Sequence, residues 1–143
     1  MAEREYRIKV LCCVDGSEES KKAARLSGRF GRLTGAHITL FHVIDEALTL
    51  DEVPDTEPYR EAKARGEQIL QEAKRIVEEE GGSCDTKMVV GPAVLQIVKH
   101  AELGDYDVIC MGTRGMTGLK RMLLGSTADR VIRYAHCPVT VVR

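Results

Sequence analysis

Apolar residues gather in short continuous runs along the chain, and longer stretches with helical spacing separate these runs. Short apolar runs rich in Val, Ile and Cys are typical of strands that are buried on both faces of a parallel sheet. The runs predict strands over residues 7–14, 37–44, 84–90, 108–111 and 138–142.

The stretches between the predicted strands carry the start and stop signals of amphipathic helices. Ser17, followed by two glutamates, is a preferred N-cap residue, and Gly35 is a C-cap candidate. Pro92 fits the first turn of a third helix, because that position needs no backbone donor. The pattern predicts helices from Ser17 to about Thr34, from Tyr59 to Glu80, from Ala93 to Glu102 and from Ser126 to about Ala135.

The apolar positions of the first two helices predict which side chains face the core. In the first helix these are small or apolar residues, namely Ala23, Ala24, Leu26, Ser27 and Phe30. In the second helix they are Ala62, Ile69, Leu70, Ala73, Ile76 and Val77. The segment from Asp45 to Glu57 has no consistent period, and Pro54 and Pro58 lie among its acidic residues, so we expect a mobile surface loop there.

The predicted elements alternate between strand and helix along the whole chain. This order indicates one doubly wound α/β domain over residues 1–143, with a parallel sheet, right-handed crossovers and helices on both faces. With 143 residues and 43% hydrophobic content, the chain is long enough to bury a core.

The charge balance argues against several classes of partner. Lys and Arg number 21 against 22 Asp and Glu, which gives no support for coating nucleic acid or for binding a membrane surface. The first residues, Met1 to Glu5, are too charged for a signal peptide, and no apolar run approaches transmembrane length. We therefore expect a cytoplasmic protein without nucleic-acid or membrane partners.

The cysteines and histidines favour no metal or redox site. Five cysteines form no Cys-x-x-Cys pair, and the four histidines lack ligand spacing. Most of the cysteines fall in predicted strands, where a reduced thiol behaves as a small hydrophobe. Cys137 precedes Pro138 at the entrance of the last strand.

Two turns at the carboxyl ends of predicted strands carry unusual chemistry. Asp15-Gly16-Ser17 follows the first strand, and a loop with glycines at 112, 115 and 118 follows the fourth. Gly125-Ser126-Thr127 then opens a helix, whose free N–H groups and positive dipole end suit a phosphate. If the first and fourth strands are neighbours, both turns meet at one crevice.

Each candidate also has a plain structural interpretation. Asp15 holds a ribose hydroxyl or Mg²⁺ beside a phosphate chain, or it is simply a turn residue. Ser17 is more simply an N-cap than a ligand contact. Arg114 contacts phosphate or is solvated, and Lys120 and Arg121 are surface charges that add favourable potential. The chain lacks the Gly-x-x-x-x-Gly-Lys-Ser/Thr loop of P-loop enzymes and the Gly-x-Gly-x-x-Gly of dinucleotide-binding folds.

The spacing of the glycines resembles a known signature. Gly112-x-x-Gly115, nine residues and then Gly125-Ser126 match the ATP signature of the universal stress protein family, in its UspA-like, ATP-binding type. Val14-Asp15-Gly16-Ser17 and His136-Cys137-Pro138-Val139 match the family as well, so the resemblance covers nearly the whole chain. It implies a five-stranded sheet of order 3-2-1-4-5, bound ATP or AMP, and homodimers.

The resemblance also implies roles for individual residues. Asp15 matches the position that contacts ribose or metal, and Val14 and Val43 match apolar positions on the adenine side. The ribose and phosphate contacts match Met111, Gly112, Arg114 and Gly115, and a second phosphate contact matches Gly125, Ser126 and Thr127.

Three functions compete on this pattern. The first is a stress-response regulatory protein in which nucleotide occupancy, or slow ATP turnover, acts as a switch on a regulated protein that the sequence does not identify. The second is a nucleotide hydrolase or nucleotide-alpha transferase on the same fold; no nucleophile–base pair supports it, so at most slow ATP hydrolysis is expected. The third is a scaffold that has lost nucleotide binding, against which the intact glycines argue.

The last predicted strand indicates a dimer interface. Pro138, Val139, Thr140, Val141 and Val142 form a mostly apolar strand without a lysine or an inward charge. At the edge of a sheet of order 3-2-1-4-5, such a strand invites pairing with a second copy about a two-fold axis.

Overall fold

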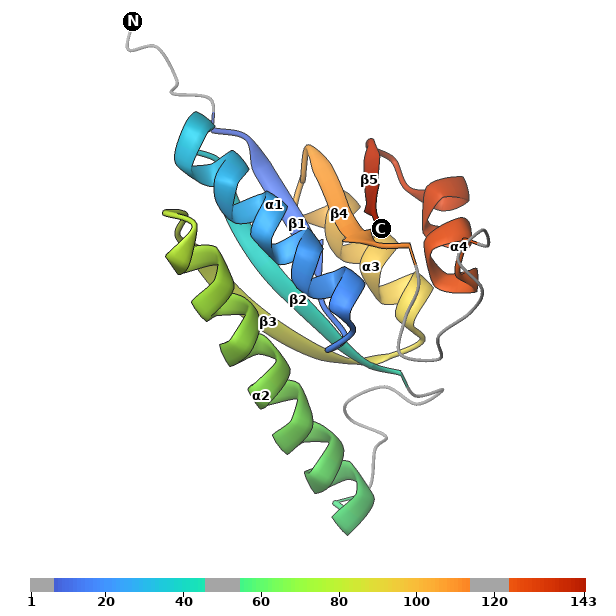
Figure 1. Cartoon of the computed structure of the whole chain (residues 1–143). Helices are drawn as coiled ribbons and strands as arrows, with labels where there is room; N and C mark the ends of the chain where they lie inside the picture. The colour runs from blue at the N-terminus through green and yellow to red at the C-terminus, as the bar shows by residue number, and fades with distance from the viewer. Residues whose placement is uncertain (1–6, 46–54, 114–123) are drawn as a thin grey trace, which may run out of the picture.

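The computed structural model describes residues 7–45, 55–113 and 124–143. Figure 1 shows strands and helices alternating along the chain. They are β1 (Lys9–Cys13), α1 (Glu18–Thr34), β2 (His37–Asp45), α2 (Glu57–Glu79), β3 (Cys84–Gly91), α3 (Ala93–Leu103), β4 (Val108–Gly112), α4 (Ser126–Tyr134) and β5 (Val139–Val142).

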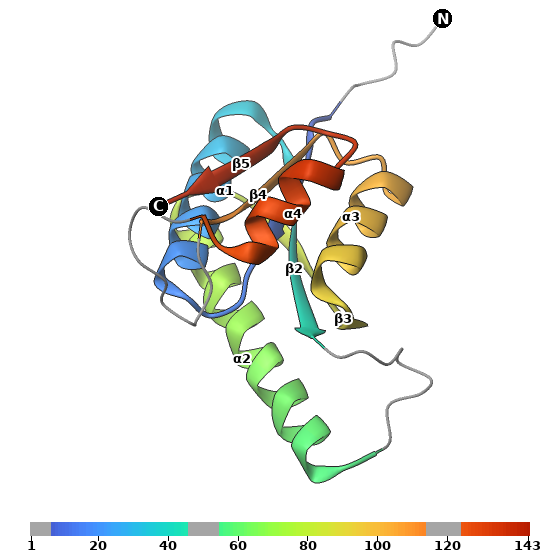
Figure 2. The ribbon, with the colours of Figure 1, turned by 90° about the vertical axis from the view of Figure 1, so that its right-hand side faces the viewer.

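The five strands form one parallel sheet with the order β3-β2-β1-β4-β5, which confirms the predicted fold class. Helices α1 and α2 cover one face of the sheet, and α3 and α4 cover the other (Figures 1 and 2). Successive side chains of a strand point to opposite faces, so each face has its own apolar core. Leu11, Phe41 and Ile109 lie in the core on the α3 and α4 side, and Ile38 and Leu40 lie in the core on the other side.

Helix α1 packs through small residues, but its inward face differs from the one predicted from the sequence. Ala23, Ala24 and Ser27 are buried as expected, whereas Leu26 and Phe30 are 42% and 38% exposed. Gly28 and Gly31 are buried in their place, because α1 lies too close to its neighbours for larger side chains. A Cβ atom on Gly28 would lie 2.9 Å from the Val77 carbonyl oxygen of α2.

The predicted end of β2 and the predicted start of α2 are wrong by one or two residues. Asp45 belongs to β2, and α2 begins at Glu57, so Pro58 lies in its first turn, where the missing N–H costs no helical hydrogen bond. Helix α3 begins at Ala93, as predicted, and Pro92 is its N-cap rather than a residue of its first turn. The rest of the predicted loop, residues 46–54, lies outside the described residues.

The five cysteines are free thiols, and Cys84 and Cys137 are only partly buried. Cys12, Cys13 and Cys110 are buried in β1 and β4. Burial raises the pKa of the Cys13 thiol, and it raises that of Cys84 to about 11, so both thiols are neutral at physiological pH. Among the described residues, no helix is long and apolar enough to span a bilayer.

Candidate nucleotide site

The sheet order brings two sequence-predicted turns to one crevice. Strand β1 pairs with β4 in register, with Cys12 opposite Cys110, so the carboxyl ends of both strands lie side by side. Helix α1 leaves β1 toward one face and α4 follows β4 on the other, which makes this edge the topological switch point of the sheet. In open α/β sheets, ligands bind at such a point.

The turn after β1 is held by its own hydrogen bonds. Asp15 Oδ1 accepts from the Ser17 N–H at 3.0 Å, and Gly16 has a φ of +86°, which favours glycine. Ser17 Oγ accepts from the Ser20 N–H at 3.1 Å. Ser17 is therefore the N-cap of α1, and one Asp15 oxygen serves the turn.

The turn after β4 leads to a helix that starts differently. Thr113 N–H donates to the Val142 carbonyl at 2.8 Å, and Gly125 N–H donates to the Thr113 carbonyl at 2.6 Å, so the start of α4 is tied to the end of β4. Gly125 is the N-cap of α4 and offers no side-chain acceptor. Within the described residues, the first N–H groups of α4, including those of Ser126 and Thr127, therefore lack a side-chain cap.

Gly112 is needed for a reason that sequence reasoning did not find. A Cβ atom at this position would lie 2.7 Å from Glu19 Cβ and 3.0 Å from the Ser20 nitrogen. The missing side chain lets the first turn of α1 lie directly against the end of β4. Gly112 thereby fixes the spacing between the two walls of the crevice, whatever ligand contact it also makes.

The remaining predicted residues fall into three groups. Met111 is 6% exposed and Val14 is 4% exposed, so both side chains belong to the cores beneath the crevice. Val43 is half-buried near the end of β2. Arg114 and Gly115 lie outside the described residues, as do Gly118, Lys120 and Arg121.

Among the described residues, the backbone of Val43 has no ladder partner on the side of the β1 turn, and we call this the open edge of Val43. Phe41, two residues earlier in β2, directs its carbonyl to β1, where it accepts from Val14 N–H at 2.9 Å. Alternation along the strand directs the Val43 N–H and C=O the same way, beyond the last residue of β1. The next rung, from Val43 N–H to the Val14 carbonyl, is not formed between these two described residues. The Val14 carbonyl accepts from His42 Nδ1 instead, at 2.8 Å.

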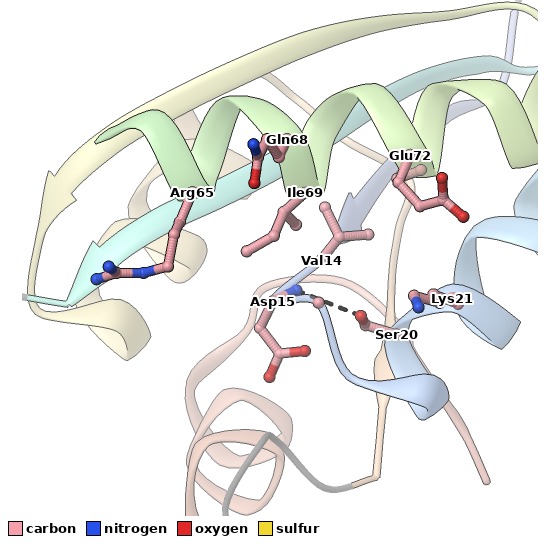
Figure 3. A pocket seen from close by; sticks show the side chains of 10 residues that line it. Val14, Asp15, Ser20, Lys21, Arg65, Gln68, Ile69 and Glu72 are labelled. Carbon is pink, nitrogen blue, oxygen red and sulfur yellow. Dashed lines mark hydrogen bonds between the residues drawn. The ribbon is translucent and has the colours of Figure 1, made fainter. Parts of the chain in front are cut away.

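A cavity of about 330 Å³ lies between the β1 turn and α2 (Figure 3). Figure 3 shows Ile69 above Val14 and the Asp15 carboxylate pointing away from α2. Glu72, at the rim, is bound by the Arg75 guanidinium, whose hydrogen bond lowers the pKa of the Glu72 carboxyl. Five of the lining residues were not predicted from the sequence to belong to a site, namely Ser20, Lys21, Arg65, Gln68 and Glu72.

Gly66 is the sequence signal that points to α2. It lies within the amphipathic helix, on the same face as Leu70 and Ala73, where an isolated glycine indicates close packing. A Cβ atom there would lie 2.5 Å from Met88 Sδ and 2.8 Å from His42 Cδ2. Gly66 therefore lets α2 lie directly over His42, at the end of β2.

Asp15 is the one residue that was predicted to bind a metal ion. Among the described residues, His, Cys, Asp and Glu side chains form no group of three that would hold a metal ion. Mg²⁺ beside a nucleotide needs less, because it is commonly held by one or two carboxylates together with phosphates and water. With Oδ1 serving the turn, the Asp15 carboxylate fits that role through its second oxygen.

Comparison with known proteins gives one family over nearly the whole chain. The model of the universal stress protein family matches residues 7–143. Universal stress protein MJ0531 of Methanocaldococcus jannaschii is 38% identical over 138 residues, which cover 94% of this chain and 81% of that protein. Universal stress protein YxiE of Bacillus subtilis is 32% identical over 145 residues, covering 94% of this chain and 98% of that protein. The solved structure of MJ0577, also from M. jannaschii, is 32% identical and covers 94% of each chain with a TM-score of 0.78.

More distant solved structures of the same fold contain nucleotides. A universal stress protein of Archaeoglobus fulgidus was solved with dAMP (23% identity, TM-score 0.74, 96% of this chain and 98% of that one). An Arabidopsis thaliana protein of the family was solved with AMP (20% identity, TM-score 0.69, 94% and 90%). Another universal stress protein was solved with cAMP (21% identity, TM-score 0.77, 95% and 97%). At these identities, each likeness shows a shared fold.

Proposed function

This chain belongs to the universal stress protein family, and from that premise we propose that it is an adenine-nucleotide-binding regulatory protein. ATP or AMP would lie in the crevice between the β1 turn and the start of α4. Nucleotide occupancy, or slow ATP turnover, would act as a switch on a protein partner in the stress response. The dAMP, AMP and cAMP complexes of related folds support an adenine nucleotide as the ligand class.

The open backbone edge of Val43 is the observation that carries the proposal. Strand alternation directs its N–H and C=O past the end of β1, and neither group is paired with β1 among the described residues. Adenine presents a ring acceptor, N1, next to an exocyclic donor, the N6 amino group, which complements one peptide N–H and C=O. Guanine presents donor and acceptor in the reverse order, so an edge of fixed orientation prefers adenine.

The start of α4 supports phosphate binding. Its first N–H groups lack a side-chain acceptor within the described residues, and the positive end of the helix dipole lies there. Ser126 is exposed and Thr127 is half-buried, so their N–H groups lie near the surface of the crevice. A phosphate is the natural acceptor for such a group of donors.

Asp15 would complete the site between base and phosphates. Its backbone is fixed by the Ser20 hydroxyl, which accepts from the Asp15 N–H at 3.3 Å. Its carboxylate points away from α2, and one oxygen is engaged in the turn. The second oxygen would accept from a ribose hydroxyl or hold Mg²⁺ beside the phosphates.

Calorimetry with ATP, ADP and AMP tests the proposal. Replacing buried Gly125 with Val should abolish ATP binding, because the added side chain blocks the approach of phosphate to α4. The circular dichroism spectrum should stay that of the wild type. Equal ATP affinities of wild type and Gly125→Val would show that the site is not at the start of α4. ATP turnover at about 1–10³ per second would favour a nucleotide hydrolase or nucleotide-alpha transferase instead.

We also propose that β5 forms a homodimer interface. The strand lies at the edge of the sheet, where one row of backbone N–H and C=O groups is open to a second copy. Val139 and Val141 contact one core, and Val142 contacts the other, so the strand is anchored in a fixed orientation. Replacing Val141 with Pro should lower the molar mass found by light scattering to that of a monomer. A monomeric wild type, or a fully dimeric Val141→Pro variant, would contradict this interface.

A further inference from the structure

His42 is a buried histidine in strand β2, where it lies between Phe41 and Val43. Its side chain is 9% exposed, and its Nδ1 lies 2.8 Å from the Val14 carbonyl oxygen. A carbonyl only accepts, so Nδ1 carries the proton and donates it to this bond. The imidazole thus binds the last residue before the Asp15 turn.

This bond is made to the carbonyl oxygen that would accept the next rung of the β1–β2 ladder. His37 N–H donates to the Ile8 carbonyl at 2.7 Å, and the same pattern, six residues further along both strands, joins Val43 N–H to the Val14 carbonyl. In the described chain that bond is absent, and the Val14 carbonyl accepts from His42. One side chain has replaced one rung of the sheet.

We propose that His42 is a positioning residue that keeps the Val43 N–H available to the base of a bound nucleotide. By satisfying the Val14 carbonyl, it ends the β1–β2 ladder one rung early and leaves the Val43 N–H directed into the crevice. The inference rests on the proposed adenine site and adds a residue that does not touch the nucleotide. His42 acts through Val14 and Val43.

Helix α2 holds the imidazole in place. A Cβ atom on Gly66 would lie 2.8 Å from His42 Cδ2 and 3.2 Å from His42 Nε2, so the helix backbone packs against the ring edge opposite Nδ1. A side chain at position 66 would push the ring and lengthen its bond to Val14. Gly66 does not line the cavity beside Asp15, yet this geometry links it to base recognition.

Amide hydrogen exchange in the nucleotide-free protein tests whether His42 ends the β1–β2 ladder. Replacing His42 with Leu keeps the bulk and removes the donor, so Val43 N–H should pair with the Val14 carbonyl and exchange at least about tenfold more slowly, the equivalent of one hydrogen bond. Replacing His42 with Asn restores a donor near the position of Nδ1, and Val43 should again exchange rapidly. Unchanged exchange in folded His42→Leu would overturn the proposal without reference to any nucleotide.

The second test is whether the Val43 N–H binds the base. It compares the affinities of ATP and of 1-deaza-ATP, which lacks the ring acceptor N1. His42→Leu and Gly66→Ala should each lower ATP affinity about tenfold and leave 1-deaza-ATP affinity unchanged, while His42→Asn should restore ATP affinity. Equal losses for both nucleotides would indicate general distortion and overturn the role of His42. If the wild type binds no adenine nucleotide, the proposed function fails, and the exchange experiment still decides whether His42 replaces the rung. Gly66→Ala keeps the binding test available if His42→Leu does not fold.

Discussion

Helices α1 and α4 both follow a strand at the crevice, but their first turns are satisfied in different ways. At α1, Ser17 Oγ accepts from the Ser20 N–H, and the Ser20 hydroxyl donates to the Ser17 carbonyl at 3.0 Å. At α4, the N-cap is Gly125, which has no side-chain acceptor. The start of α1 is capped by its own side chains, and we call it closed. Within the described residues, the start of α4 has no side-chain cap, and we call it open.

This difference assigns separate tasks to the two walls of the crevice. The closed start of α1 makes the Asp15 turn a rigid support, since Asp15, Ser17 and Ser20 bind one another. The open start of α4 leaves N–H donors for an anion. Under the proposed function, the start of α4 would bind the phosphates, and the Asp15 turn would hold the geometry of the site.

Adding a side-chain N-cap to α4, like the one that α1 has, should have the largest effect on ATP binding. Gly125→Asp places a carboxylate at the N-cap, where it accepts from the α4 N–H groups and repels phosphate. ATP affinity should fall at least about a hundredfold, because hydrogen bonds to a charged group are each worth about 1.5–3 kcal/mol. Gly125→Ala is the matched control for the added Cβ atom. Equal ATP affinities of the Asp and Ala variants in calorimetry would show that the open N-terminus does not bind phosphate.

Forcing the two walls apart should mainly affect stability. Gly112→Ala places a Cβ atom 2.7 Å from Glu19 Cβ and 3.0 Å from the Ser20 nitrogen. Overpacking of this kind costs about 1–3 kcal/mol of unfolding free energy. Urea denaturation measures the loss, with exposed Ser126→Ala as the control that stays within about 0.5 kcal/mol. A Gly112→Ala variant as stable as wild type would show that the α1–β4 contact yields easily.

Removing the N-cap side chain of α1 should have the smallest effect. Ser17→Ala removes the acceptor for the Ser20 N–H and should cost about 1 kcal/mol of unfolding free energy. ATP affinity should stay near that of the wild type, because Ser17 is 4% exposed and serves as a cap. Urea denaturation and calorimetry on the same samples separate the two effects. A large loss of ATP affinity with unchanged stability would make Ser17 a ligand contact and remove the contrast with α4.

The sequence predicted the elements well because each carries a local signal. Short apolar runs located the strands, and Ser17 and Gly35 marked both ends of α1, where Gly35 takes the left-handed conformation with a φ of +76°. The resemblance to the family supplied the strand order. The burial of Gly28 and exposure of Leu26 were not predicted, because the width of the gap between two helices is a tertiary property.

The candidate site was predicted residue by residue, yet its geometry was not. Asp15 and Gly125 were predicted as site residues from turn chemistry and glycine spacing, which are local signals. The contact between Gly112 and Glu19, and the bond from His42 to Val14, join residues that are far apart in the sequence. Only the register of the strands brings them together. The available signals were an isolated glycine in a helix, Gly66, and a histidine flanked by Phe41 and Val43, and neither signal identifies the residue that it contacts.

Titration of ¹⁵N-labelled protein with ATP, followed by amide NMR, tests the central claim most directly. We expect the largest shifts at the amides of Val43, Gly125, Ser126 and Thr127, with that of Val43 moving downfield as it bonds to the base. GTP at the same concentration should leave Val43 nearly unchanged. No shifts at millimolar ATP, or shifts confined to residues away from the ends of β1, β2 and β4, would contradict the account.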